Sequence, residues 1–227
     1  MKQLVSRLRD LASDVGPDWR PAAGRDYGRH GDLLRELNGC TFHHGTVRIL
    51  GCRDDLPSLD LETWNDPSTW TFAWPASSRP DGYAIFGETA WGDQYAYRGT
   101  WAEPEGVYIL ESTYLEPLRL ADTLEQFLDE ELLRVAQAPY DRYTVEALAE
   151  HGPVDARDHW AFVPSLVIGG EPDVHRVTTI GAVDAMVVNG DVLAQYEAAE
   201  DGSVVVGLED WTDDRGRRRA RLVTRRA

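Results

Sequence analysis

Four residues of the types that commonly bind metal ions lie close together in the first quarter of the chain. Cys40, His43, His44 and Cys52 follow a C-x2-H-H-x7-C pattern, and thiolate and imidazole groups are the usual ligands of structural zinc. The spacing matches no common zinc signature, and neighbouring histidines on a strand face opposite sides of a sheet. The pattern therefore favours a turn with incidental polar residues, and we predict no metal or other cofactor.

Carboxylates offer a second kind of chemistry. Glu88, Asp93 and Glu111 fall near the ends of expected strands, where two acids at the right separation form a glycosidase pair. The chain has 39 Asp and Glu residues, so such coincidences are frequent, and Asp93 is better explained as part of a hairpin turn. No Ser or Cys lies in a nucleophile motif, and no glycine loop carries the Lys of a phosphate-binding site. We therefore predict no catalytic residue.

The negative charge of the chain is concentrated in its middle. The formal net charge is -16, and residues 54 to 175 contain 24 acidic residues but only six arginines, whereas the segments before and after them are nearly balanced. An anionic surface of this kind argues against binding to nucleic acid or to anionic lipid. It favours a basic protein partner, with the alternative that the acids only maintain solubility.

The predicted partner-binding surface combines acidic residues with an aromatic one, because exposed Trp residues are frequent hot spots of protein interfaces. A charged helix face is also often merely solvated, so both explanations stay open for the acidic run at 129 to 131. The predicted partner-binding residues are Asp54, Asp55, Asp60, Glu62, Asp66, Glu88, Trp91, Asp93, Asp129 and Glu130.

Five of the seven residues from 215 to 221 are arginines, which at first suggests a site for nucleic acid. Arginines that alternate along a hairpin strand point to opposite faces and can pair with carboxylates across the strand. We therefore predict that this arginine cluster balances the acidic middle of the same chain.

Hydrophobic periodicity predicts the elements that must position these residues. Apolar residues at helical spacing predict helices over 4–12, 32–37, 59–64, 121–137 and 144–151. A hairpin is expected over 41–50 around Gly45, followed by strands over 83–86, 93–98 and 107–111. Trp70, Phe72 and Trp74 are expected to be mostly core. Beyond Asp158, valine-rich runs separated by turn residues such as Asn189-Gly190 predict an antiparallel meander with strands over 160–163, 174–180, 183–188, 192–196 and 204–208.

The order of four of these segments resembles the SUKH superfamily of Smi/Knr-type proteins. The matching pieces are residues 33–39, 45–50, 86–97 and 123–133. The resemblance implies an α+β fold with a mixed, curved sheet flanked by helices, and it implies the function of the bacterial members that act as immunity proteins against polymorphic toxins. The pattern consists of fold-setting residues, so it transfers no site residue to this chain. The loop at 15–31 and the segment after Asp158 lie outside it.

We therefore expect an α+β fold with a C-terminal antiparallel β extension, in which residues 1–157 form the SUKH-like core and residues 158–227 a β-rich extension packed on it as one globular unit. No apolar run reaches the roughly 18 residues that span a bilayer, so the expected compartment is the cytoplasm and no membrane partner is predicted. The two cysteines are expected to be reduced thiols, although one bridge between them is conceivable.

The predicted function is that of an immunity protein, not an enzyme, which neutralises a cognate bacterial toxin, for example a nuclease, by stoichiometric protein binding. The expected partner is that toxin or another basic protein, and no nucleic acid. One alternative is a regulatory scaffold of the Smi/Knr type. The other is an enzyme that acts on a small polar substrate, which requires an enclosed pocket with convergent polar groups.

Overall fold

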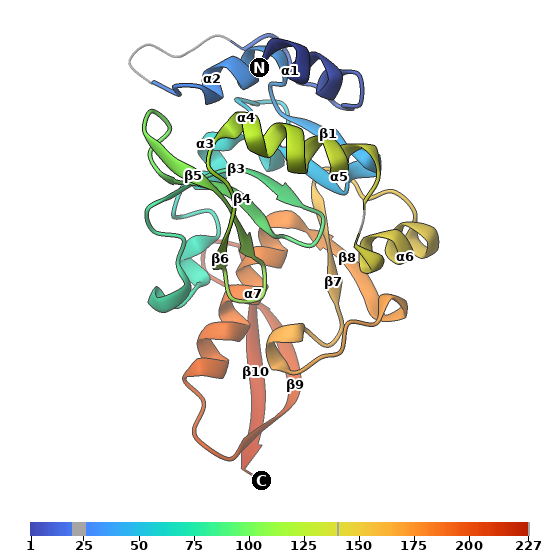
Figure 1. Cartoon of the computed structure of the whole chain (residues 1–227). Coiled ribbons are helices and arrows are strands. Elements are labelled where there is room, and N and C mark those ends of the chain that lie inside the picture. Colours follow the sequence, from blue (N-terminus) through green and yellow to red (C-terminus); the bar gives the residue numbers. More distant parts are fainter. Residues whose placement is uncertain (20–25, 140, 227) are drawn as a thin grey trace.

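The centre of the molecule is a six-stranded antiparallel sheet (Figure 1), seen in a computed structural model that describes residues 1–19, 26–139 and 141–226. The strands lie side by side in the order of the sequence, and each described neighbouring pair is antiparallel, whereas the resemblance implies a mixed sheet. The α+β class and the hairpin around Gly45 are confirmed. The strands are β1 (Cys40–Phe42), β2 (Val47–Ile49), β3 (Tyr83–Thr89), β4 (Gln94–Gly99), β5 (Pro104–Glu111) and β6 (Glu116–Ala121).

One long helical segment packs its apolar stripe against an aromatic face of this sheet. It comprises α4 (Leu124–Phe127), a π-helical turn (Leu128–Leu132) and α5 (Leu133–Gln137), and it begins where the Thr123 side chain accepts a hydrogen bond from the Gln126 N–H. The Phe127 ring lies 5.5 Å from Phe86 and 5.1 Å from Tyr95. The predicted helix over 121–137 is confirmed as a helical segment over 124–137, which begins later because residues up to Ala121 belong to β6.

Four further helices lie before residue 157 in the described part of the chain. α1 (Lys2–Arg9) and α2 (His30–Glu36) lie together at the end of the molecule opposite the C-terminus (Figure 1). α3 (Leu61–Asn65) begins at Asp60, whose side chain accepts from the Thr63 N–H, and α6 (Arg142–His151) begins at Asp141. Short 3-10 turns connect these elements: η1 (His43–Gly45), η2 (Pro57–Leu59), η3 (Thr71–Ala73) and η4 (Ala76–Ser78).

The tryptophans of residues 64–74 form a buried ladder, as the sequence predicts. Trp64, Trp70 and Trp74 are almost completely buried, with ring centroids 6.0 and 6.2 Å apart along the series. Each indole N–H has an acceptor, since Trp64 donates to the Gln94 side chain at 2.7 Å and Trp70 to the Trp64 carbonyl at 3.0 Å. Such satisfied indoles bury a large apolar area without a hydrogen-bond penalty.

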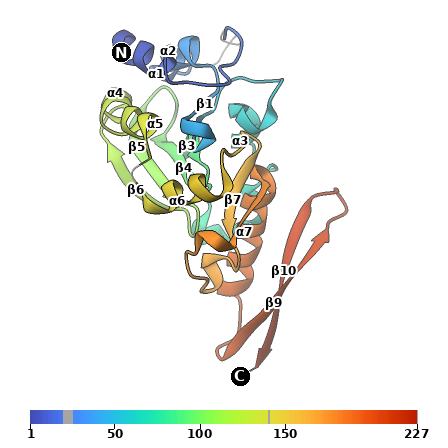
Figure 2. The ribbon, with the colours of Figure 1, turned by 90° about the vertical axis from the view of Figure 1, so that its right-hand side faces the viewer.

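The part of the chain after residue 157 contains two antiparallel strand pairs and a long helix. Strands β7 (Asp158–Phe162) and β8 (Val177–Gly181) pair with each other, with the turns η6 (Leu166–Ile168) and η7 (Val174–Arg176) between them. The predicted C-terminal hairpin is confirmed as β9 (Ser203–Thr212) and β10 (Arg218–Arg226), which stands beside α7 (Ala182–Glu197) and away from the six-stranded sheet (Figure 2). Buried residues from both sides of residue 157 belong to one apolar cluster.

The strands predicted over 183–188 and 192–196 are wrong, because both segments belong to the 16-residue helix α7. This helix buries residues on most of its circumference, so its apolar residues show no helical stripe and resemble a buried strand in the sequence. Asn189-Gly190 is therefore not a turn. Gly190 instead allows the helix to approach η3, since a Cβ at this position would lie 2.6 Å from Cδ1 of Trp74. Trp74 also donates its indole N–H to the Met186 carbonyl at 2.9 Å.

Replacing Gly190 with alanine is therefore expected to destabilise the protein by about 1 to 3 kcal/mol, as overpacking of a core does. The alanine gains up to about 1 kcal/mol of helix propensity, which the displaced Trp74 ring outweighs. Urea unfolding measures the difference. Gly207→Ala on β9 is the matched control, because its Cβ would meet only Val223 at 3.8 Å. An equal effect of both substitutions would contradict the close approach of α7 to Trp74.

Candidate functional site

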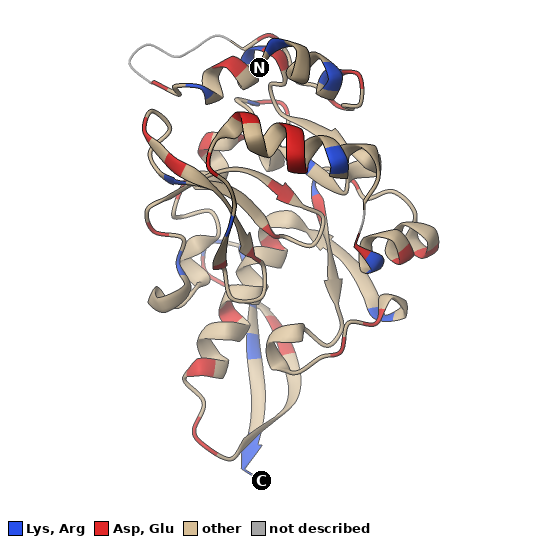
Figure 3. Ribbon diagram, in the orientation of Figure 1, with Lys and Arg blue, Asp and Glu red and all other residues tan. Residues whose placement is uncertain are grey.

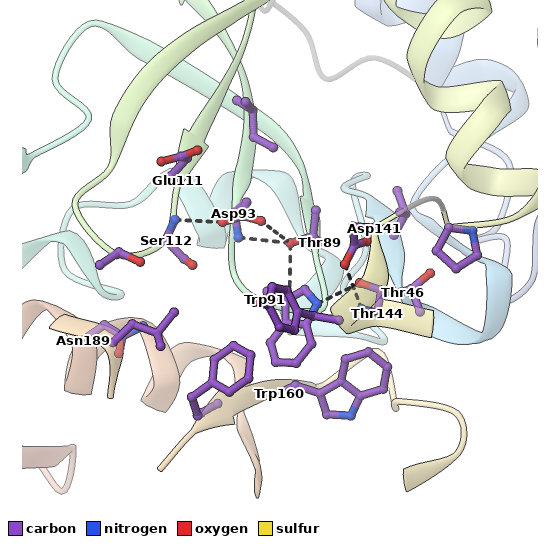
Figure 4. Close-up of a pocket in the computed structure, with 18 of the residues that line it drawn as sticks. Thr46, Thr89, Trp91, Asp93, Glu111, Ser112, Asp141, Thr144, Trp160 and Asn189 are labelled. Carbon is purple, nitrogen blue, oxygen red and sulfur yellow. Dashed lines mark hydrogen bonds between the residues drawn. The ribbon is translucent and has the colours of Figure 1, made fainter. Parts of the chain in front are cut away.

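A pocket of about 470 Å³ lies where two turns of the sheet meet α6 and the segment from β7 to η6 (Figure 4). The β3–β4 turn and the β5–β6 turn supply one side, and α7 contributes Asn189. The hairpin turn at Gly92 is possible because its φ of 86° is accessible to glycine. The labelled lining residues are Thr46, Thr89, Trp91, Asp93, Glu111, Ser112, Asp141, Thr144, Trp160 and Asn189.

One wall of the pocket is aromatic. The Trp91 ring stacks on Phe162 with the centroids 4.6 Å apart and the planes 5° from parallel, and Trp160 lies 5.2 Å from Trp91. Tyr143 meets the edge of Phe162 at 6.0 Å and is 38% exposed. The Trp91 indole donates to the Thr144 hydroxyl at 2.8 Å (Figure 4). The wall therefore joins the sheet, α6 and β7, and its rings are held in place by one another.

The Asp93 carboxylate fixes the two turns to each other. One oxygen accepts from the Thr89 hydroxyl at 3.0 Å, and the other accepts from the Ser112 N–H at 2.9 Å (Figure 4). The Thr89 oxygen in turn accepts from the backbone N–H groups of Trp91 and Asp93. Asp93 is half-buried, and each of its oxygens has further acceptor capacity.

The pocket is lined by three carboxylates, and its lining contains no Lys or Arg among the residues that the structure describes. These carboxylates belong to Asp93, Glu111 and Asp141. Asp141 uses one oxygen to cap α6 through the Thr144 N–H at 2.8 Å. Glu111 is exposed and stands directly across the β5–β6 pair from Glu116, a like-charge arrangement that destabilises an isolated sheet. The site is thus an acidic and aromatic pocket without internal charge compensation.

Of the ten predicted partner-binding residues, only Trp91 and Asp93 line this pocket. The others lie on separate elements, and Figure 3 shows acidic positions from the N-terminal helices to the C-terminal elements. Asp129 lies 4.0 Å from Arg7 of α1, and Glu130 accepts from Gln126. Both remain exposed on the π-helical turn.

Five predicted residues belong to the segment from 54 to 66. Asp54 and Asp55 are exposed. The Asp55 carboxylate accepts hydrogen bonds from Nε and Nη2 of Arg53 at 2.8 and 2.7 Å. Asp60 caps α3, and the Glu62 carboxylate accepts from the Tyr27 hydroxyl at 3.2 Å. The Asp66 side chain accepts from the Ser68 N–H at 2.8 Å. Most of these carboxylates therefore have local structural roles, and they lie apart from the pocket.

The prediction for Glu88 is wrong, since its side chain has no exposed surface with which to contact a partner. It lies 3.1 Å from Arg48 Nη1 and 3.0 Å from His159 Nε2, which are also buried. Burial raises the pKa of the Glu88 carboxyl, but the charges of His159 and Arg48 outweigh burial and lower the pKa below its ordinary value. Glu88 is consequently also excluded from a glycosidase pair with Asp93 or Glu111.

The structure does not bring Cys40, His43, His44 and Cys52 together as metal ligands, since no group of three or more His, Cys, Asp or Glu residues in the described part of the chain could hold a metal ion. Cys40 is buried, and burial raises the pKa of its thiol above the ordinary value. His43 and His44 lie in the turn η1 with their ring centroids 5.1 Å apart, so the predicted turn at these residues is confirmed. Both cysteines are free.

The arginine cluster balances charge inside the molecule, but its partners differ from those predicted. Arg217 binds Asp213 at 2.7 Å and holds the pKa of that carboxyl down at about 2. Arg218 pairs with Asp210 and Arg219 with Asp191. These acids belong to α7 and the hairpin, not to residues 54–175, because β10 runs along α7.

Sequence reasoning missed Asp141, Tyr143 and Phe162 of the pocket. Their only signal in the sequence is that Asp141 and Tyr143 precede a predicted helix and that Phe162 lies within a predicted strand. Their convergence depends on the docking of α6 and β7 against the sheet, which local patterns do not encode.

No protein-family model and no curated protein matches the sequence. Among solved structures, the chain is similar to the one described as the crystal structure of Atu4351 from Agrobacterium tumefaciens, with 10% identity, a TM-score of 0.46, and coverage of 90% of this chain and 83% of that one. No helix in the described ranges is long and apolar enough to cross a membrane.

Proposed function

We propose that the protein binds a basic partner protein in a stoichiometric complex, and that it acts as a cytoplasmic immunity protein against a toxin such as a nuclease. The observation that carries the proposal is the charge distribution. Arg217, Arg218 and Arg219 pair with acids of α7 and the hairpin, so they do not offset the excess of acidic residues in 54–175.

An uncompensated negative surface attracts a cationic partner over long distances and accelerates its association. The active cleft of a nuclease is cationic because its substrate is a polyanion, so an acidic protein that occupies it excludes the substrate. The pocket adds a concave acidic feature of this kind, and its aromatic wall supplies the residue types that stabilise interfaces.

The test combines growth rescue with binding measurements. Toxin domains encoded beside the gene are co-expressed with the protein, and we expect one of them to be neutralised. The association rate of that pair should fall at least about tenfold between roughly 50 and 500 mM NaCl, because salt screens long-range attraction. Failure of rescue with each neighbouring toxin, or an association rate that is indifferent to salt, counts against the proposal.

A matched pair of double variants assigns the attraction to the middle of the chain. Asp54→Asn/Glu130→Gln and Asp201→Asn/Asp214→Asn each remove two exposed negative charges. We expect the first variant to slow association more than the second. Equal slowing by both would show that net charge alone, and not its distribution, attracts the partner.

A regulatory scaffold is the second candidate function, and the exposed strand β9 supports it. Val204, Val206, Leu208 and Trp211 are each 41 to 51% exposed along this one strand, and a concentration of exposed apolar side chains on one element can mark a protein-binding surface. Recovery of several stable cellular partners, all lost when these residues are replaced by polar ones, would favour the scaffold over the immunity protein.

A further inference from the structure

We propose that the pocket of Trp91, Asp93, Glu111 and Asp141 receives one arginine side chain of the partner protein. The inference rests on the proposed function, since the arginine belongs to the basic partner, and it names the site and the chemical group that the site recognises. The pocket volume of about 470 Å³ is within the range of ordinary ligand pockets and accommodates the whole side chain.

The charge of the pocket selects a cation. Asp93, Glu111 and Asp141 line it, and no Lys or Arg does so among the described residues. The Glu111 side chain makes no hydrogen bond or ion pair within the described part of the chain, and it faces Glu116 across the strand pair. A guanidinium beside Glu111 relieves this repulsion and supplies the donors that the carboxylates lack.

The aromatic wall selects arginine over lysine. A guanidinium is planar, is less strongly hydrated than an ammonium group and stacks on aromatic rings while its N–H groups bind carboxylates. Trp91, Phe162 and Tyr143 lie beside the carboxylates in the same pocket, so both modes of contact are available to one side chain. Lysine would gain the charge attraction and lose the planar contact.

The geometry of the site is already formed without the partner. Asp93 is held by Thr89 and Ser112, Asp141 by its cap of α6, and Trp91 by Thr144 and Phe162. Preorganised acceptors bind a side chain without a large entropic cost of ordering. A small arginine compound should therefore occupy the pocket weakly even when the rest of the partner is absent.

The experiment follows the Trp91 indole N–H by NMR while blocked amino acids are added to the intact protein. Eight Trp indole signals are expected, and Trp91→Phe identifies the one that belongs to Trp91. The probes are Nα-acetyl-arginine methylamide, the lysine analogue and the citrulline analogue, which has nearly the shape of arginine but no charge. We expect saturable shifts of the Trp91 signal with arginine, weaker binding of lysine and no response to citrulline.

Glu111→Gln should weaken the binding of the arginine probe about tenfold, because the side chain keeps an acceptor oxygen but loses the charge that strengthens its hydrogen bond to the guanidinium. Glu103→Gln is the matched control, since this residue is exposed and does not line the pocket, and it should retain binding. A Trp91 signal that ignores arginine, responds equally to citrulline or lysine, or is unaffected by Glu111→Gln overturns the inference.

Measurements with the toxin separate the two proposals. If Glu111→Gln leaves toxin affinity unchanged while wild-type binding depends on salt, the arginine site is wrong and the proposed function stands. If the arginine probe binds as expected but no basic protein is neutralised, the pocket chemistry stands and the immunity function is wrong. Both proposals are supported together only if Glu111→Gln weakens toxin binding and if the replacement of one particular toxin arginine with alanine weakens binding to the same extent.

Discussion

Glu88→Gln is expected to destabilise the protein by about 3 to 5 kcal/mol, the usual cost of breaking a buried ion pair by removing one partner. The substitution preserves the shape of the side chain, but it leaves the Arg48 guanidinium buried without a counter-charge. Arg48 is 0% exposed, and it donates to the carbonyls of Asp155 and Asp158 as well as to Glu88. Loss of the carboxylate charge should therefore weaken the attachment of β7 to the sheet. Urea unfolding at neutral pH measures the loss.

The double variant Glu88→Gln/Arg48→Met provides the control, because it removes both charges and fills the space of the Arg48 side chain with apolar atoms. We expect it to recover a large part of the stability that the single variant loses. A single variant that loses less than about 1 kcal/mol would mean that the carbonyl groups alone compensate Arg48.

The second large effect is a loss of stability in acid that originates at His30. This residue is 1% exposed among Phe86, Tyr97 and Trp101, with ring centroids at 5.5, 5.7 and 5.0 Å. Its Nδ1 lies 3.2 Å from the Tyr97 hydroxyl, and its Nε2 has no hydrogen-bond partner in the described structure. Burial lowers the pKa of His30 from 6.5 to about 3, because the apolar surroundings penalise the charged ring.

Between these two pKa values the unfolded chain binds a proton at His30 and the folded chain does not. Stability is therefore fully present above pH 6.5 and falls as the pH is lowered toward 3, by at most about 1.4 kcal/mol per pH unit. From pH 7 to pH 5 the contribution of His30 is a loss of about 2 kcal/mol. Between pH 7 and pH 5 the free energy of unfolding should therefore fall by about 2 kcal/mol more for the wild type than for His30→Gln, whose side chain does not titrate. Parallel profiles would mean that His30 is accessible to protonation in the folded state.

The strands β1 to β5 were predictable because their information is local, whereas β6 was not predicted. The β1–β2 and β3–β4 hairpins turn at Gly45 and Gly92, whose φ angles of 85° and 86° suit glycine, and Tyr95 and Tyr97 alternate with smaller residues along β4. The segment 183–196 was not predictable in the same way. A helix that is apolar on most sides has no distinguishing period, and the role of Gly190 depends on Trp74, which lies far away in the sequence.

The candidate site was only partly predictable for a similar reason. Trp91 and Asp93 stand out as an aromatic and an acidic residue in a hairpin turn, whereas Tyr143 and Phe162 acquire their role only when α6 and β7 dock beside that turn. The burial of Glu88 was likewise invisible, because Arg48 and His159 come from different elements. Residue type suggests which chemistry is available, but contacts between distant segments decide which residues exercise it.

The contact of Arg48 with residues 155 and 158 has a consequence for the order of assembly. The six-stranded sheet joins consecutive strands and can form as the chain leaves the ribosome, whereas the pairs that involve Arg48 span 107 and 110 residues and close late, because distant segments meet slowly. The aromatic wall at Phe162 is completed only by that late step. We therefore expect a nascent or partly folded chain to lack the pocket, so that the proposed recognition through it takes place only in finished molecules.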